Sequence, residues 1–363
     1  MTVTERETIP RTVDAVAEHV FETVVASGET MAMALGHRLG WYAALAGGEP
    51  TTAAQLAEAT GTHERYCREW LEQQAASGML DVAAPSSDTD RRFVLPPPVA
   101  EVMTNADSLA YLAPLARMFA TAARDYELVA AAARTGGGVS WEAHGADMRE
   151  SQADANRPAF LTLMADWLSS MPDVVERLRA PGARIADVGS GYGWSSVAMA
   201  RAFPGARVDC FEVDAESVVA ARAIAEDEGV ADRVTVSEVD IAAALPEQRY
   251  ALVTAFECIH DMPDPVGVLT AMREMAGNDG TVLVMDERTA DELTAPAEIY
   301  ERFLYGVSLF VCLPDGLSTP GSVGTGTVMR APVLRGYAQA AGFSDIEVLD
   351  VDNDFFRFYR LLR

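Results

Sequence analysis

The stretch from Arg184 to Trp194 constrains the fold of this chain more than any other. It reads Arg-Ile-Ala-Asp-Val-Gly-Ser-Gly-Tyr-Gly-Trp, so an apolar run ends in an acid, three glycines follow at alternate positions, and a helical pattern begins at Trp194. Glycines let the backbone approach a ligand at the edge of a parallel sheet, where a helix amino terminus faces an electron-rich group. The stretch predicts a strand, a tight turn and a helix that bind a nucleotide-like ligand.

The spacing of the glycines restricts the kind of nucleotide. The dinucleotide fingerprint places a third glycine where the helix packs on the strand, but this chain has the bulky Trp194 there. NAD is therefore disfavoured. A P-loop is excluded because it needs a lysine, and all 28 basic residues of the chain are arginines.

Three more predicted strands follow, and each ends in an acidic residue at the same edge of the sheet. Strand 207–212 ends at Glu212 with Asp214 close behind, 234–239 ends at Asp240 and Ile241, and 250–256 ends at Glu257. Apolar strand patterns alternate with helical ones, which predicts an α/β fold with a mainly parallel sheet.

Asp-x-Gly-x-Gly-x-Gly followed by these strand ends resembles the class I S-adenosylmethionine-dependent methyltransferases. The resemblance implies a Rossmann-like seven-stranded sheet closed by a hairpin over 346–351 and 355–362, with S-adenosylmethionine as cofactor. In that family the second strand's acid binds the ribose, and its spacing favours Glu212 over Asp214. The implied cofactor-binding residues are Asp187, Gly189, Gly191, Gly193, Glu212, Asp240, Ile241 and Glu257.

The first hundred residues predict helices and a winged-helix module. Two apolar helical patterns occupy residues 12–46, and we expect them to pair with a second subunit. Residues 51–95 then predict a helix, a turn, a second helix and two short strands joined by the loop 83–91. Between Thr51 and Asn105 there are four arginines against eight carboxylates. A DNA reader needs a basic face, so dimerisation is the preferred role of this module.

We expect three parts: a helical and winged-helix dimerisation domain over 1–105, a linker with substrate-pocket helices over 106–180, and a cofactor-binding methyltransferase domain over 181–363. Within the second part, three glycines at 136–138 precede Trp141 and His144. This loop is predicted either to cover the ligand or to link two domains. The candidate substrate-pocket residues are Trp141, His144, Met164, Trp167, Tyr300 and Phe303.

Methyl transfer from a sulfonium requires a base only when the acceptor is a hydroxyl or an acidic carbon. His260 and Asp261 follow the strand 250–256, and histidine has a suitable ordinary pKa near 6.5. The segment 258–264 resembles the His-Asp-Trp-x-Asp segment of small-molecule O-methyltransferases, in which the histidine is the base, although Met262 replaces the tryptophan. The alternative is a histidine that caps the following helix.

A second resemblance is to bacterial winged-helix methyltransferases. It is carried by Leu-Gly-x-Arg-Leu-Gly at 35–40, by Cys312-Leu313-Pro314 and by Gly-x-Gly-Thr at 324–327. That group includes 2-oxo acid C-methyltransferases whose His-Asp pair helps bind iron with a later histidine. Here His260 is the last histidine, so no metal is expected unless His144 or Cys312 replaces that ligand.

The sequence thus predicts a cytoplasmic, homodimeric methyltransferase of a small, partly apolar acceptor. The preferred reaction is O-methylation, and the alternative reaction is C-methylation of a 2-oxo acid or another activated carbon. The alternative from another functional class is a ligand-sensing transcriptional regulator. The net charge of −26 argues against nucleic-acid and membrane partners. Four dispersed cysteines, a polar amino terminus and the lack of an 18-residue apolar run agree with the cytosol.

Overall fold

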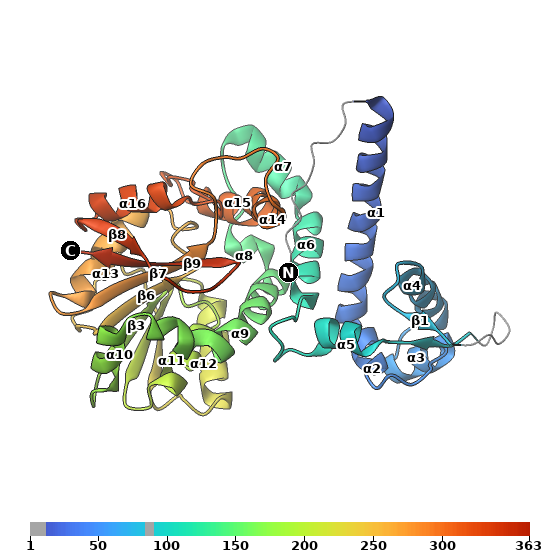
Figure 1. Ribbon diagram of the computed structural model, residues 1–363, viewed down its shortest axis with the longest axis horizontal. Coiled ribbons are helices and arrows are strands. Elements are labelled where there is room, and N and C mark those ends of the chain that lie inside the picture. Colours follow the sequence, from blue (N-terminus) through green and yellow to red (C-terminus); the bar gives the residue numbers. More distant parts are fainter. Residues whose placement is uncertain (1–11, 84–90) are drawn as a thin grey trace. The chain divides into compact units, whose positions relative to one another are not determined.

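A computed structural model describes residues 12–83 and 91–363, which form two compact units (Figure 1). The winged-helix unit comprises residues 12–124 and 146–158, and the sheet unit comprises 125–145 and 159–363. The predicted middle part, 106–180, is therefore no unit of its own, because its residues divide between the two. Helix α9, Ala146–Ser169, belongs to both units, and Pro158 lies inside it where the division falls.

The winged-helix unit has the predicted helix, turn, helix and two-stranded wing. Residues 84–90 of the wing loop lie outside the described residues. Besides part of α9, its elements are α1 Val13–Arg38, α2 Trp41–Leu45, α3 Ala53–Thr60, α4 Glu64–Ala76, β1 Asp81–Val82, β2 Phe93–Val94, α5 Pro97–Thr104 and α6 Ala113–Arg124.

Helix α1 joins the first predicted amino-terminal pattern and most of the second into one helix of 26 residues, and Trp41 and Leu45 of the second pattern lie in α2. It ends where Gly40 takes a positive φ of 70°, so the break comes later than the sequence pattern indicated. Gly36 has a packing role, because a Cβ there would lie 2.4 Å from the Trp70 ring. The amino-terminal half of α1 instead exposes apolar side chains, among them Val20 and Val24. That face is available to a partner.

The sheet unit contains a seven-stranded sheet in the order β5-β4-β3-β6-β7-β9-β8, which confirms the predicted fold class. The first five strands in this order are parallel and β9 is antiparallel to both of its neighbours. The strands are β3 Arg184–Val188, β4 Arg207–Glu212, β5 Val234–Glu238, β6 Leu252–Phe256, β7 Thr281–Glu287, β8 Asp345–Val348 and β9 Phe356–Leu362. The last two form the predicted closing hairpin.

Helices cover both faces of this sheet, so its central strands β6 and β7 are buried on both sides (Figure 1). One face packs on the end of α9 and on α10 Pro172–Arg179, α11 Trp194–Ala202 and α12 Ala215–Asp227. The other packs on α13 Pro265–Ala276 and α16 Ala331–Ala340. The unit also contains α7 Tyr126–Thr135, α8 Trp141–His144, α14 Ile299–Val307, the π-helical turn Ser308–Cys312 and α15 Leu313–Gly316. The carboxyl ends of the parallel strands form the edge at which a ligand would bind.

Candidate active site

The glycine loop connects β3 to α11 as the sequence predicted. Gly189, Gly191 and Gly193 all have positive φ, between 52° and 79°, which L side chains rarely adopt. A Cβ at Gly189 would lie 2.9 Å from Cys258 Sγ, whereas a Cβ at Gly191 would meet nothing within 4 Å. Gly191 therefore faces open space, and the loop is shaped for a close approach of its backbone.

Asp187 supports this loop from behind. Its carboxylate accepts hydrogen bonds from the hydroxyls of Ser195 and Ser196, both at 2.6 Å, and from Thr254 at 2.8 Å. The side chain is 1% exposed, and burial raises its pKa. Because both carboxylate oxygens already bind hydroxyls of the protein, Asp187 fixes the start of α11 to β3 and β6.

Glu212 lies against the glycine loop, while Asp214 has another task. Glu212 Oε2 accepts from the Gly191 N–H at 2.7 Å, and Oε1 accepts from the amides of Val213 and Asp214. Asp214 caps α12 by accepting from the amide and hydroxyl of Ser217. Of the two acids that compete for the ribose, Glu212 is thus the one beside the loop.

The next two strand ends also lie at this edge. Asp240 is exposed after β5 and accepts from the Ala242 amide at 2.9 Å, and its neighbour Ile241 is 3% exposed. Glu257 follows β6 with a positive φ of 52°, a conformation that is strained for a side chain other than glycine. Such strain is common where a loop must aim residues at a ligand.

His260 is buried among carboxylates in the loop after β6. Its Nδ1 lies 2.8 Å from Asp286 Oδ1 and 3.3 Å from Glu287 Oε2, and its Nε2 lies 3.2 Å from Asp261 Oδ1. Asp286 and Glu287 are the last residues of β7, so adjacent strands bring the acids to the imidazole. The helix α13 is capped by Asp264, which accepts from the Gly267 amide. His260 is therefore not the helix cap.

The charges of this cluster differ from those of isolated side chains. Burial alone lowers the pKa of His260, but Asp261, Asp286 and Glu287 outweigh it and hold the pKa well above its ordinary value. Burial raises the pKa of Glu287 well above its usual range, whereas the nearby imidazolium overcomes burial and lowers the pKa of Asp286. The cluster therefore favours a protonated His260 beside an ionised Asp286, and Glu287 keeps its proton to higher pH than an isolated glutamate does.

The segments that contain the two late sequence motifs, 312–314 and 324–327, lie against the loop after β6 that contains His260. The Gly326 N–H donates to the His260 carbonyl at 3.1 Å, and a Cβ at Gly316 would lie 3.1 Å from the Asp261 carbonyl oxygen. Cys312 brings its sulfur into a group with His260 and Asp261 in which one ligand atom from each lies within 4.8 Å of the others. Burial raises the pKa of the Cys312 thiol to about 12. Residues 312–316 and 324–327 thus form the wall beside His260.

Comparisons with known proteins agree with this geometry. Residues 27–105 match the family described as an Rv2258c-like winged HTH domain, and residues 180–316 match a methyltransferase domain. The chain thus joins an Rv2258c-like winged-helix domain to a methyltransferase domain, and its fold is that of the class I methyltransferases.

A ubiquinone biosynthesis O-methyltransferase of Xanthomonas campestris pv. campestris strain B100 is 33% identical over 111 residues, which is 31% of this chain and 46% of that relative. The chain thus matches under half the length of this curated relative. Two solved structures share the whole fold. The mitomycin 7-O-methyltransferase MmcR has a TM-score of 0.73 at 23% identity, covering 96% of this chain and 98% of its own. Human N-acetylserotonin methyltransferase in complex with SAM has 0.74 at 15% identity, covering 98% and 99%.

The glycine-rich loop at 136–138 and the residues after it dock on α15. The Val139 N–H donates to the Pro314 carbonyl at 2.9 Å, and the Trp141 N–H donates to Asp315 Oδ1 at 2.7 Å. A Cβ at Gly138 would lie 2.1 Å from the Pro314 carbonyl oxygen, so this glycine is needed for the contact. Residues 125–145 belong to the sheet unit, which favours the cover over the interdomain linker.

Asp315 brings this loop close to the acids at the carboxyl ends of the strands. Burial, followed by the charges of Asp261, Asp214 and Glu212, raises its pKa to about 7, although the hydrogen bond from Trp141 works in the opposite direction. The carboxyl group is therefore close enough to the acids of both β4 and the His260 loop to interact with their charges.

The predicted substrate-pocket residues lie in three different settings. Met164 and Trp167 belong to the core: they are 2% and 4% exposed, and Trp167 packs on Phe356 and Phe358, so placing them in the pocket was wrong. Buried His144 binds Asp125 at 2.9 Å and supports α8. Trp141 is partly exposed just after the glycine-rich loop, and Tyr300 and Phe303 are half-buried against Phe355.

Three residues of the site were not predicted from the sequence: Asp286, Glu287 and Asp315. Asp286 and Glu287 end a parallel strand, so the rule that identified Glu212 and Glu257 would have found them too. Asp315 follows Cys312 by three residues on a short helical segment. No local pattern indicates that this segment lies beside Asp261.

Proposed function

We propose that this protein is an S-adenosylmethionine-dependent methyltransferase that methylates a hydroxyl group of a small, partly apolar acceptor. One observation carries the proposal: the glycine loop with Glu212 and the carboxylate-flanked His260 follow the carboxyl ends of the neighbouring parallel strands β3, β4 and β6. The relatives named as O-methyltransferases support the same reaction class.

The residues present fit the cofactor. Gly191 faces open space. Glu212 lies beside it and accepts from the Gly191 amide, so the same carboxylate would be in place to accept from ribose hydroxyls. Asp240 and Ile241 would hold the adenine, while Gly189, Gly193 and Glu257 shape the backbone around the ligand, with Asp187 behind them. When bound, the cofactor supplies an electrophilic methyl group on a sulfonium.

His260 is the proposed general base, and Asp261 is the proposed positioning residue. Asp286 fixes Nδ1, which leaves Nε2 on the side of Asp261, whose side chain is 26% exposed. The acceptor hydroxyl would approach there and pass its proton to Nε2. Asp286 then stabilises the imidazolium that forms.

The resting charge of His260 sets a condition on this mechanism. An imidazolium cannot accept a proton, so the ring must first release one. A cationic donor in the neighbouring pocket lowers the pKa of the imidazole, since like charges disfavour the protonated form. Donor binding and base activation are coupled in this proposal.

Incubation with methyl-labelled donor and a panel of phenols, amines and 2-oxo acids tests the function. We expect label on a phenolic oxygen, with Tyr300, Phe303 and Trp141 favouring aromatic acceptors. Label on a carbon of a 2-oxo acid would replace O-methylation by the second candidate. If the donor binds and no acceptor class becomes labelled, the enzymatic proposal fails.

Metal-assisted C-methylation of a 2-oxo acid is the second candidate, and Cys312 is the observation in its favour. His260, Asp261 and Cys312 offer nitrogen, oxygen and sulfur ligands in one group, a donor set that suits zinc or iron(II). The test is metal content after purification and dialysis. Stoichiometric metal that is lost in Cys312→Ala would support this candidate, and metal-free active enzyme would dismiss it.

We further propose a homodimer formed through α1 rather than a DNA-binding protein. The exposed face of α1 is apolar, with Val20 and Val24 at its centre. In α4, the helix that would enter a groove, Arg65 is paired with Glu69 and Arg68 with Glu64. In the part of the chain that the structure describes, no helix is long and apolar enough to cross a bilayer.

A further inference from the structure

The short helix α15 touches two other segments of the candidate active site. The residues after the glycine-rich loop lie against it, because the Val139 N–H donates to the Pro314 carbonyl at 2.9 Å. The loop after β6 is equally close, since a Cβ at Gly316 would lie 3.1 Å from the Asp261 carbonyl oxygen. Asp315 stands between these two contacts in the sequence and is the ionisable residue of α15. It is therefore the side chain with which α15 can act on a charged ligand.

The carboxylate of Asp315 is oriented by one hydrogen bond and keeps its charge. Its Oδ1 accepts from the Trp141 N–H at 2.7 Å. Among residues 12–83 and 91–363, no arginine or histidine pairs with this carboxylate, and its Oδ2 has no hydrogen-bond donor. The bond to Trp141 thus fixes one oxygen in place, while the other can still accept a hydrogen bond or face a positive charge.

Other acids add negative charge around Asp315. Glu212 is 9% exposed, and both of its oxygens accept from backbone amides rather than from a cationic side chain. Burial, followed by the charges of Asp261, Asp214 and Glu212, raises the pKa of Asp315 to about 7. These acids come from the end of β4 and from the loop after β6. A cation held between the two segments would relieve their mutual repulsion.

The proposed donor carries such a positive charge at its reacting atom. Transfer moves the methyl group from sulfur to the acceptor oxygen, the proton of that oxygen passes to His260, and the sulfonium becomes a neutral thioether. Donor and product therefore differ by one positive charge at the sulfur. Glu212 is the proposed ribose ligand and His260 the proposed base, so the proposed place of the sulfur is between them. Those are the two segments whose charges act on Asp315.

We propose that Asp315 is a specificity-determining residue that selects S-adenosylmethionine over its product S-adenosylhomocysteine. Its ionised carboxylate attracts the sulfonium of the donor and has no such attraction for the neutral thioether. The attraction ends when the methyl group has been transferred, so the product leaves more readily than it would from a site that binds both forms equally. This inference rests on the proposed function and adds a residue to its donor site.

Calorimetric titration of the full chain with both compounds at pH 8 tests the inference. Most Asp315 side chains are ionised at this pH before ligand is added, because the pKa is about 7. Asp315→Asn keeps an acceptor for the Trp141 amide and removes the charge. S-adenosylmethionine should bind this variant about tenfold more weakly, whereas the affinity for S-adenosylhomocysteine should change by less than about twofold. Sinefungin, which carries an amine in place of the methylated sulfonium, should weaken as the donor does because it is also a cation.

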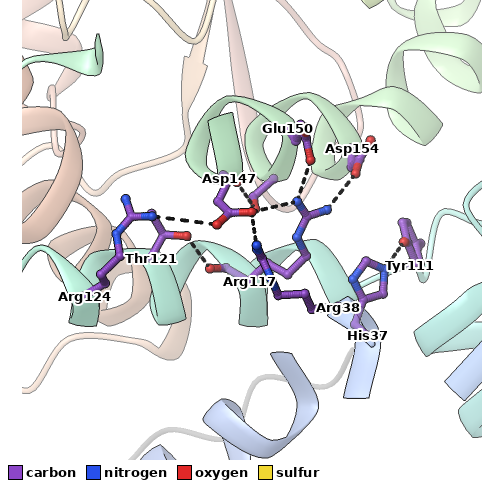
Figure 2. Close-up of polar contacts among 10 residues, drawn as sticks. His37, Arg38, Tyr111, Arg117, Thr121, Arg124, Asp147, Glu150 and Asp154 are labelled. Atoms are coloured by element: carbon purple, nitrogen blue, oxygen red, sulfur yellow. Dashed lines mark hydrogen bonds and ion pairs between the residues drawn. The ribbon is translucent and has the colours of Figure 1, made fainter. Parts of the chain in front are cut away.

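Asp154→Asn is the matched control. Burial also raises the pKa of Asp154, but this residue belongs to the winged-helix unit and lies 3.4 Å from Arg117 (Figure 2). It should leave all three affinities unchanged. The inference is overturned if the ratio of the two dissociation constants is the same in Asp315→Asn as in the unchanged chain, which is also the result expected if Asp315 only supports the loop. If the unchanged chain binds neither compound, the proposed function fails and this inference fails with it.

Discussion

The imidazole of His260 and the carboxylate of Asp286 form a buried pair that joins the loop after β6 to the end of β7, with Nδ1 2.8 Å from Oδ1. Both side chains are at most 2% exposed. This pair fixes Nδ1 and directs Nε2 toward Asp261.

The first prediction concerns the imidazole itself. His260→Ala should lower turnover about 10²- to 10⁴-fold, the usual contribution of a general base, while donor affinity is largely kept. Single-turnover rates and donor calorimetry separate the two effects. If donor affinity collapses while turnover at saturation survives, His260 is not the base.

The second prediction concerns the pH dependence of turnover. Neighbouring carboxylates raise the pKa of His260, so turnover should rise with pH as the imidazole loses its proton, and the bound cationic donor should place this rise below the pKa of the donor-free enzyme. Asp286→Asn removes a carboxylate that raises this pKa and should move the rise to lower pH. Asp264→Asn is the control, because Asp264 is exposed in the same loop and caps α13. A pH profile of turnover that does not move in Asp286→Asn would contradict the base assignment.

The third prediction is a stability effect at Asp315. Its pKa is about 7 in the folded chain, well above the ordinary value of 3.8, so the folded state holds the proton more tightly than the unfolded state. The free energy of unfolding therefore falls as pH rises from about 4 through 7 and levels off above about pH 8. Asp315→Asn keeps an acceptor for the Trp141 amide without that charge.

Urea unfolding at two pH values checks this effect. At pH 8.5 the Asp315→Asn variant should be more stable than the unchanged chain by on the order of 2 kcal/mol, after allowance for partial exposure. At pH 5.5 the difference should shrink, because Asp315 is then largely protonated. Equal differences at both pH values would show that the carboxyl group carries no such cost.

The fourth prediction addresses the exposed face of α1. Val20→Glu with Val24→Glu should convert a dimer into monomers, because two charges would enter an apolar interface. Ala26→Glu is the control, since Ala26 is exposed on the opposite side of the same helix. Sedimentation velocity gives the mass of each variant. A monomeric unchanged chain, or a dimer that persists in the double variant, would rule out this interface.

Local patterns were enough to predict the parts of the site that lie within one strand and its following turn. The alternate glycines, Glu212 and the helix-turn-helix fall into this class, because their geometry depends on neighbours in the chain. The same holds for the closing hairpin of β8 and β9.

Contacts between distant segments could not be predicted in this way. Asp286 is 26 residues from His260 and reaches it only because β6 and β7 are neighbours in the sheet. Trp167 shows the opposite error: its helical spacing fits a core and a pocket equally well, and the position of α9 over β9 decides for the core. The division of residues 106–180 between two units likewise depends on tertiary contacts.

Donor calorimetry with Glu212→Gln tests the central claim most directly, which is that the glycine loop and Glu212 hold S-adenosylmethionine. Glu238→Gln is the matched control, because Glu238 is exposed and pairs with Glu212 in register on the neighbouring strand. We predict one site per chain, about tenfold or more weaker binding in Glu212→Gln, and unchanged binding in the control. Failure of the unchanged chain to bind the donor, or equal affinity in Glu212→Gln, would contradict the account.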